Sequence, residues 1–312
     1  MIAFVVSALR SSGDMLFQRL PLWGAYTRND FRADIIAGAS VAAVLIPQSI
    51  AYALLAGLPP AHGLYAALVG GIGGALWGGS RYLATGPIAI ASLLTAGAIA
   101  PLALPGSPSY IALVAGLALF VGLIQVVSGL ARFGFLVRLV PLSVLVGFSS
   151  AAAFVIIITQ VPHFLGIPIS SGAYALEQLL HVIRNSAALN LSTVIIGSAA
   201  LALLFFFRVL NPKLPGTVIV IVAGVAASYV IDFQALGVAV AGAIPARLPI
   251  TDIPSVSMAQ LLSLSGHAFV IALVGFMSAY ATVKEFSQRT REKMNPDQEL
   301  VGQGFANILA GL

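Results

Sequence analysis

Long uncharged stretches are the feature that most constrains the fold of this chain. No Asp, Glu, Lys or Arg occurs between Ile35 and Ser80 or between Tyr82 and Ala131. Charged residues make up 8% of the 312 residues, whereas about a quarter of the residues in a soluble domain are charged. A helix that crosses a bilayer needs about 20 apolar residues, so the chain has room for roughly eight spans. The sequence therefore predicts an all-α polytopic membrane protein.

Apolar runs bounded by charged or turn residues mark the spans. We place them at 34–56, 61–78, 86–103, 109–131, 138–161, 191–210, 215–232 and 262–285, with a ninth beginning near 298. The longer polar connections, 162–190 and 233–261, have the Pro, Ser and Gly content of loops or surface helices. Residues 1–33 are expected to form a cytoplasmic lead-in.

The basic residues predict the orientation, because short cytoplasmic loops collect Lys and Arg. With the N-terminus in the cytoplasm, thirteen of the fifteen basic residues fall in cytoplasmic segments, and only Arg184 and Arg247 do not. The sequence therefore predicts a multi-pass protein of the plasma membrane. Basic residues placed in this way serve as membrane anchors, and no nucleic-acid site is indicated.

Several chemistries find no support in the sequence. The chain has no cysteine, which excludes thiolate metal sites and cysteine nucleophiles. The four histidines lack metal-ligand spacing, and no Ser/His/Asp grouping or carboxylate pair occurs within a span. We therefore expect no metal, no cofactor and no enzymatic activity. The four histidines, at predicted external edges, are His62, His163, His181 and His267.

A proline interrupts the first span at mid-membrane. Pro47 lacks a backbone donor, so we expect the helix to be kinked or broken near residues 43 to 47. Gln48 and Tyr52 follow at i and i+4, which places an amide and a phenol on one face beside the break. Either they face a polar cavity, or Gln48 bonds to a neighbouring helix in a purely structural kink.

The third span contains a second interruption, "YLATGPIAIASLL" at 82–94. Proline is favoured at the first position of a helix, so we expect a half-helix that begins near Gly86 and Pro87, deep in the bilayer. Its free amides at Ile88 and Ala89, together with its positive dipole end, would bind an anion without a charged side chain. The alternative is an ordinary helix that starts at the membrane surface.

A weak internal repeat relates the two ends of the chain. Residues 60–76 align with 296–312 at a constant offset of 236, with four identities in seventeen positions. The span before the second copy, 262–285, comes seven spans after the span before the first copy, 34–56. Because seven is odd, the two copies have opposite orientations in the membrane. Inverted repeats of this kind build secondary transporters, whose substrate site lies where broken helices meet.

Three motifs resemble the SulP (sulfate permease) anion transporters, relatives of the mammalian solute carriers that include prestin and pendrin. They are "DFRADIIAGASVAAVLIPQSIAYALLAGLPPAHGLYAALV" at 30–69, "ATGPIAIAS" at 84–92 and "NPDQELVGQGFANILAG" at 295–311. The resemblance implies a seven-plus-seven inverted-repeat fold with broken helices in spans 1 and 3. This chain would hold the first repeat and the start of the second.

The resemblance also implies that the spans belong to two domains, a core and a gate. Core-domain spans 1–4 would occupy 34–131 and gate-domain spans 5–7 would occupy 132–232. An external linker at 233–261 and the second-repeat spans at 262–312 would follow. An anion would lie between the half-helices of spans 3 and 10, and Gln48, Tyr52, Ile88 and Ser278 would fall at or near it. Its partners would be a small anion and the lipid bilayer, with a homodimer of the full-length protein as a further option.

The sequence departs from the family pattern in two ways. Family members continue through fourteen spans and usually end in a STAS domain, so we expect this chain to be a fragment lacking spans 10–14 and STAS. Many bacterial members carry a carboxylate where this chain has Ser278, which can donate a hydrogen bond to an anion or simply bond to a helix carbonyl. Without a titratable side chain in the spans that line the site, we expect electroneutral exchange or uncoupled movement of anions, unless the rest of the second repeat supplies an acid.

Three functional hypotheses follow. The first is secondary transport of sulfate, bicarbonate, chloride or a small dicarboxylate by movement of the core against the gate. The second is transport of a nucleobase-like solute by the same architecture. The third is a non-transporting membrane piece.

Overall fold

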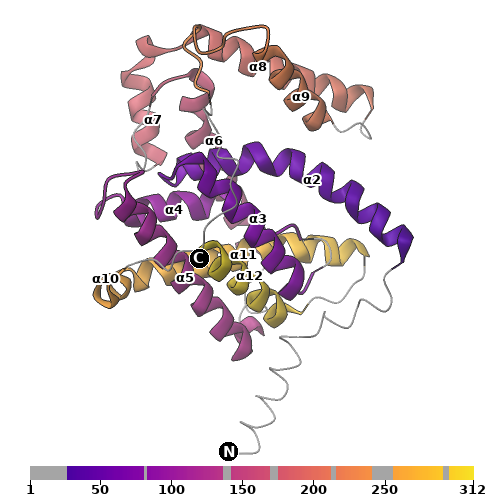
Figure 1. The fold of residues 1–312 in the computed structure, drawn as a ribbon, viewed down its shortest axis with the longest axis vertical. Coiled ribbons are helices and arrows are strands. Elements are labelled where there is room, and N and C mark those ends of the chain that lie inside the picture. The colour runs from indigo at the N-terminus through magenta and orange to yellow at the C-terminus, as the bar shows by residue number, and fades with distance from the viewer. Residues whose placement is uncertain are drawn as a thin grey trace, which may run out of the picture.

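The computed structural model describes residues 27–80, 83–135, 142–168, 175–211, 216–240, 256–290 and 295–312. Within these ranges every regular element is a helix (Figure 1). Most of the predicted lead-in, the start of the span expected at 138 and the middle of the linker 233–261 lie outside the described residues.

Each predicted span corresponds to a helix, and α8 has the predicted bounds. α2 begins at Arg28, ahead of the expected residue 34, because Thr27 and Asp30 form a capping box there. The described helices are α2 (Arg28–Leu55), α3 (Pro60–Trp77), α4 (Ala89–Ile99), α5 (Pro108–Leu130), α6 (Leu142–Leu165), α7 (Ala175–Arg184), the 3₁₀ turn η3 (Ser186–Ala188), α8 (Leu191–Leu210), α9 (Gly216–Ser228), α10 (Met258–Ser263), α11 (Ser265–Thr290) and α12 (Pro296–Ala310).

Four of these helices are long and apolar enough to cross a membrane, judged by length and composition. They are α2, α5, α8 and the Ser265–Ser287 part of α11. Shorter apolar helices occur at Ala89–Ile99, Ala153–Leu165 and Gly216–Ser228. Eleven residues span only about 16 Å, which is about half the thickness of a bilayer core.

The helices pack in two groups (Figure 1). α12 contacts α3 and α5 extensively, α2 packs on α3, and α11 packs on α4 and α5. In the other group α6 packs on α7 and α8, and α8 packs on α9. Because α12 comes last in the chain, the first group joins segments from both ends of the sequence.

Glycines bring α12 close to the backbones of α3 and α5. A Cβ added to Gly122 of α5 would lie 2.6 Å from the Gly304 carbonyl oxygen of α12, and one added to Gly73 of α3 would lie 2.9 Å from the Cα of Ala306. Both distances are shorter than real Cβ contacts. Close approach between small residues is a common way for membrane helices to associate.

The two segments of the internal repeat pack against each other. α3 begins at Pro60 and α12 at Pro296, the two prolines that align at the offset of 236. Gly78, just after α3, lies against Gly302 in the first half of α12, whereas Gly73 lies against Ala306 further along. The two helices are therefore antiparallel.

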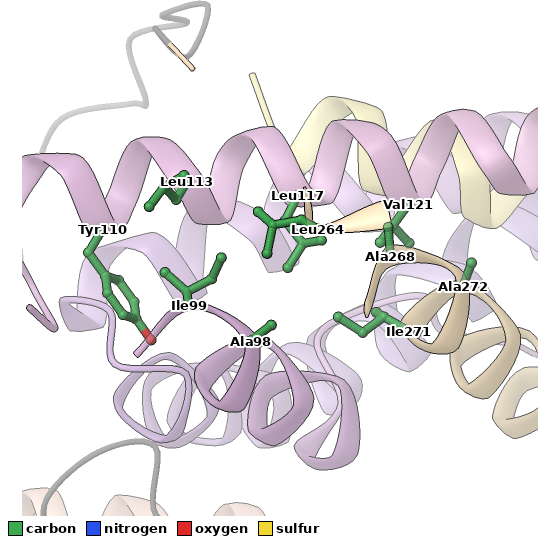
Figure 2. Close-up of a cluster of buried hydrophobic side chains, with 10 residues drawn as sticks. All are labelled: Ala98, Ile99, Tyr110, Leu113, Leu117, Val121, Leu264, Ala268, Ile271 and Ala272. Atoms are coloured by element: carbon green, nitrogen blue, oxygen red, sulfur yellow. The ribbon is translucent and has the colours of Figure 1, made fainter. Parts of the chain in front are cut away.

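A hydrophobic cluster joins α4, α5 and α11 (Figure 2). Leu117 of α5 lies among Ile99 of α4 and Ala268 of α11, and all three side chains are at most 1% exposed. At one end Tyr110 is fully buried and its hydroxyl donates to the Ala56 carbonyl oxygen at 2.6 Å. The cluster fixes α4, the short helix, against two longer ones.

Large apolar side chains cover the outside of the molecule. On α8 no residue is buried, and Phe205 and Val209 are 71% and 69% exposed. On α2, Phe31 and Ile36 are likewise exposed. Apolar surface on this scale suits lipid rather than water as the surrounding solvent. The fold is that of an all-α polytopic membrane protein.

Candidate functional site

The short helix α4 begins inside the first helix group. Residues 83–88 form no helix, and Ile88 is extended at φ −127° and ψ 143°. The first helical bond runs from the Ser92 amide to the Ile88 carbonyl. The amides of Ala89, Ile90 and Ala91 therefore precede it, and no side chain caps them.

The expected start near Gly86, with Pro87 as the first helical residue, lies two to three residues too early, because α4 begins at Ala89. Proline disfavours helical backbone in the residue before it, which keeps Gly86 extended. The extended backbone then continues through Ile88. The donors at the helix start are consequently Ala89, Ile90 and Ala91 rather than Ile88 and Ala89.

Two glycines let the segment before α4 lie between α2 and α3. A Cβ on Gly86 would lie 3.1 Å from Leu45 Cδ1 of α2. A Cβ on Gly74 of α3 would collide with the side chain of Thr85. The start of α4 is thus held beside α2, close to Pro47.

The expected break in α2 does not occur. The helix is continuous from Arg28 to Leu55 with Pro47 inside it. Proline removes one donor, so only a single helical bond must be given up, and membrane helices tolerate this loss. Two residues further on, Ser49 is fully buried and its hydroxyl donates to the Leu45 carbonyl at 2.6 Å. Gly63 of α3 packs directly on Ser49, which ties α2 to α3 just beyond the proline.

A cavity of about 870 Å³ lies in front of the α4 start. Helices α2, α3, α4, α5, α11 and α12 all contribute to its wall. The predicted site residues on this wall are Tyr52, Gly86, Pro87, Ile88 and Ser278. The structure therefore brings residues from the first, third and eighth predicted spans to one cavity.

Two other predicted site residues are not on the cavity wall. Ala89 is buried at the first position of α4. Gln48 is exposed, and its amide donates to the Tyr52 hydroxyl at 2.8 Å. This bond confirms that Gln48 and Tyr52 share one helix face, but Gln48 reaches the cavity only through Tyr52. On α11, the carbonyl of Ser278 accepts a bond from Thr282, which also lines the cavity.

A chain of carboxamides crosses the wall opposite to α2. Asn307 of α12 donates to Gln125 Oε1 of α5 at 2.8 Å and to the Gln303 carbonyl at 3.1 Å. Gln125 in turn donates to the Ala272 carbonyl of α11 at 3.1 Å. Gln303 donates to the buried carboxylate of Glu299 at 3.4 Å. The chain links α5, α11 and α12, and Gln125, Gln303 and Asn307 all line the cavity.

The sequence contained a signal for this chain of carboxamides that motif reading missed. Glu299, Gln303 and Asn307 are spaced by four residues, which places them on one face of a helix. Gln125 is a lone amide in an otherwise apolar span. A buried amide needs partners, so the spacing indicated a polar face on one helix and a lone amide in need of a partner, without identifying which helices meet.

The described residues on the cavity wall include no Asp, Glu, Lys or Arg. The positive end of the α4 dipole therefore faces a space without charged side chains to compete with it. Polar groups on the wall are hydroxyls, carboxamides and one imidazole. Such a wall suits an anion held by backbone donors.

Curated relatives match most of this chain. A probable sulfate transporter of Mycobacterium tuberculosis (strain CDC 1551 / Oshkosh) is 38% identical over 288 residues, which is 92% of this chain and 51% of the relative. Solute carrier family 26 member 6 of Homo sapiens is 32% identical over 326 residues, covering 96% of this chain and 43% of the relative. The chain spans about half the length of the curated relatives it matches.

Solved structures share the fold. Murine Solute Carrier 26 family member A9, an anion transporter in the inward-facing state, superimposes with a TM-score of 0.81 at 22% identity, over all of this chain and 54% of that one. The transmembrane domain of the cyanobacterium bicarbonate transporter BicA gives a TM-score of 0.75 at 24% identity, over 92% of this chain and 74% of that one.

The motifs at 30–69, 84–92 and 295–311 belong to one continuous family match. The model of the sulfate permease family matches residues 31–312, which includes the start of α4, the cavity wall and the carboxamide chain. Together with the shared fold, this match shows that the chain belongs to the sulfate permease family.

Proposed function

We propose that this chain is part of a secondary transporter that moves small inorganic or organic anions across a membrane. The observation that carries the proposal is the start of α4, where Ile88 and Ala91 line a large cavity without charged residues among its described lining and no side chain caps the first amides. A helix N-terminus binds anions through its amides and its dipole. The names of the relatives, sulfate transporters and an anion solute carrier, support the same substrate class.

The anion lies, in this proposal, between the α4 start and the polar side chains of α2 and α11. The uncapped amides of Ala89, Ile90 and Ala91 supply the donors, of which Ala91 belongs to the cavity wall, while Tyr52 and Ser278 on that wall supply hydroxyl donors. Gly86, Pro87 and Ile88 keep the segment before α4 extended and clear of the ligand. Gln48 acts through its bond to Tyr52, whose hydroxyl it orients.

Transport requires that the site open to each side in turn. The two packed helix groups support a mechanism in which residues 34–131 and 262–312, as the core, move against residues 132–232, as the gate. In this topology the N-terminus lies in the cytoplasm and the protein resides in the plasma membrane.

A nucleobase-like solute is the second candidate, and the carboxamides favour it. A purine pairs well with amide side chains, and Gln125, Gln303 and Asn307 line the cavity. However, both amide hydrogens of Asn307 already bond within the protein. The second candidate therefore has fewer free donors than the α4 start offers to an anion.

Uptake into liposomes separates these functions. The protein is reconstituted, and labelled sulfate, bicarbonate, chloride, a dicarboxylate and uracil are offered in turn. Saturable uptake of one or more anions, with no uptake of uracil, is the expected result. Uptake of uracil alone would assign the second function, and no uptake of any solute would leave a non-transporting membrane protein.

A further inference from the structure

One side chain on the cavity wall is an imidazole, which can bind a proton. His62 is the only histidine among the described lining residues, and none of the others is acidic or basic. An imidazole ordinarily titrates at about pH 6.5. A proton on His62 would therefore put the first positive side-chain charge into the wall.

The position of His62 is fixed by the start of α3. Pro60 is the first residue of α3, and the His62 amide bonds back to the Pro59 carbonyl at 3.1 Å. The imidazole contacts Tyr65 edge to face, with ring centroids 6.2 Å apart. Its Nδ1 atom is buried and has no hydrogen-bond partner.

A buried polar atom without a hydrogen-bond partner is uncommon in folded proteins. A neutral imidazole carries one donor and one acceptor, whereas a protonated imidazole carries two donors. The described residues of the wall include no carboxylate that could accept a hydrogen bond from the protonated ring. An anion in the cavity would supply the negative charge that a protonated imidazole needs nearby.

The groups that face the cavity from every packed element are uncharged. Phenols, hydroxyls and carboxamides offer hydrogen bonds but carry no charge at neutral pH. By element they are Tyr52 of α2, Tyr65 of α3, Thr85 before α4, Ser92 and Thr95 of α4, Gln125 of α5, Ser278 and Thr282 of α11, and Gln303 and Asn307 of α12.

We propose that His62 is the proton-binding group of the anion cavity, so that a proton and the anion bind together. The inference rests on the proposed function and adds its coupling ion. Because opposite charges attract strongly where water is scarce, a bound anion favours the protonated ring, and the protonated ring strengthens anion binding by the same factor. The sequence-based expectation of exchange or uncoupled movement assumed that no titratable group lines the site, and His62 contradicts that premise.

The test compares the pH profiles of two histidine variants. Reconstituted full-length protein and its His62→Gln variant are assayed for the KM of labelled anion between external pH 5.5 and 8. The unmodified protein should bind the anion roughly tenfold more tightly at the acidic end, within the range of typical couplings between ligands. His62→Gln should keep the alkaline KM at every pH. The matched control, His181→Gln, removes an exposed histidine on α7 and should retain the full pH dependence.

A second measurement needs no variant. Purified full-length protein in weakly buffered solution at pH 7 should take up protons when the transported anion is added, and chemically identical buffer without protein should not. Transport that keeps its pH dependence in His62→Gln, or anion binding without proton uptake, would overturn the inference and leave the proposed function intact. Absence of transport at every pH would instead remove the proposed function on which it rests.

Discussion

Asn307 of α12 donates a hydrogen bond to Gln125 of α5 at 2.8 Å, and the two residues are 182 positions apart in the sequence. Gln125 is 2% exposed, so this bond replaces water at a site that water hardly reaches. The Ala272 carbonyl of α11 accepts from the same Gln125 side chain. One amide therefore fixes three helices around the cavity.

Replacing either amide should destabilise the protein. Gln125→Leu leaves the Asn307 donor unpaired, and Asn307→Leu leaves the Gln125 acceptor unpaired, at a cost of about 1–3 kcal/mol each. The double variant should cost less than the two single variants together, because it leaves neither partner stranded. Thermal unfolding of the detergent-solubilised full-length protein measures all three. Gln48→Leu, at an exposed amide, is the control. Strict additivity would show that the pair does not interact.

Gly122 should not tolerate a methyl group. Its Cβ would meet the backbone of Gly304 and Ile308 at 2.6–2.8 Å, and overpacking of this kind costs about 1–3 kcal/mol. Gly97→Ala is the matched control, since no atom lies within 4 Å of its added Cβ, and alanine stabilises a helix interior by about 0.5–1 kcal/mol. The difference in unfolding temperature between the two variants is the measurement. Equal stability would mean that α5 and α12 do not pack as closely as described.

Ala89→Pro should weaken anion binding more than Ser278→Ala does. Proline suits the first helical position, and Ile88 already has the extended backbone that a following proline requires. The substitution therefore deletes one amide donor with little strain. Binding of labelled anion to the purified full-length protein should fall about tenfold or more, whereas loss of the Ser278 hydroxyl should cost less. Comparable losses would show that side chains rather than backbone amides set the affinity.

Helix α7 should lie flat in the headgroup region of the bilayer. Its exposed side chains divide into an apolar stripe, with Leu176, Leu180 and Ile183, and a polar stripe with His181 and Arg184. Helices of this type bury the apolar stripe at the membrane interface. The chain has no cysteine, so single cysteines can be introduced at 180 and 181 for spin labelling without background. Oxygen should relax the label at 180 more strongly, and a water-soluble nickel complex the label at 181; the same response at both would contradict the orientation.

The helices could be predicted closely because their signal is local. Charged and turn residues bound each apolar run, and Asn190 and Asn211 mark the ends of α8 at the predicted residues. The outcome at Pro47 could not be predicted in the same way. A proline changes one hydrogen bond, and whether the helix breaks or continues depends on neighbours such as Gly63 and Ser49.

The candidate site could be predicted in part. Gly86 and Pro87 indicated a short helix that begins just after them, because their backbone preferences act on adjacent residues. The carboxamide chain depends on which helix lies beside α12, and no local pattern in α5 specifies that neighbour. His62 was expected at an external edge, and only the packing of α3 against the other helices places it on the cavity wall.

The close fit of α12 between α3 and α5 also has a consequence for synthesis. Gly79, just after α3, is held by the Glu299 carboxylate, 220 residues later in the chain. At about 5–20 residues per second, the ribosome needs roughly 10–45 seconds to make the intervening chain. During that interval the glycine faces of α3 and α5 must be occupied by lipid, by a chaperone or by each other. The wall of the cavity is therefore complete only after α12 has been synthesised.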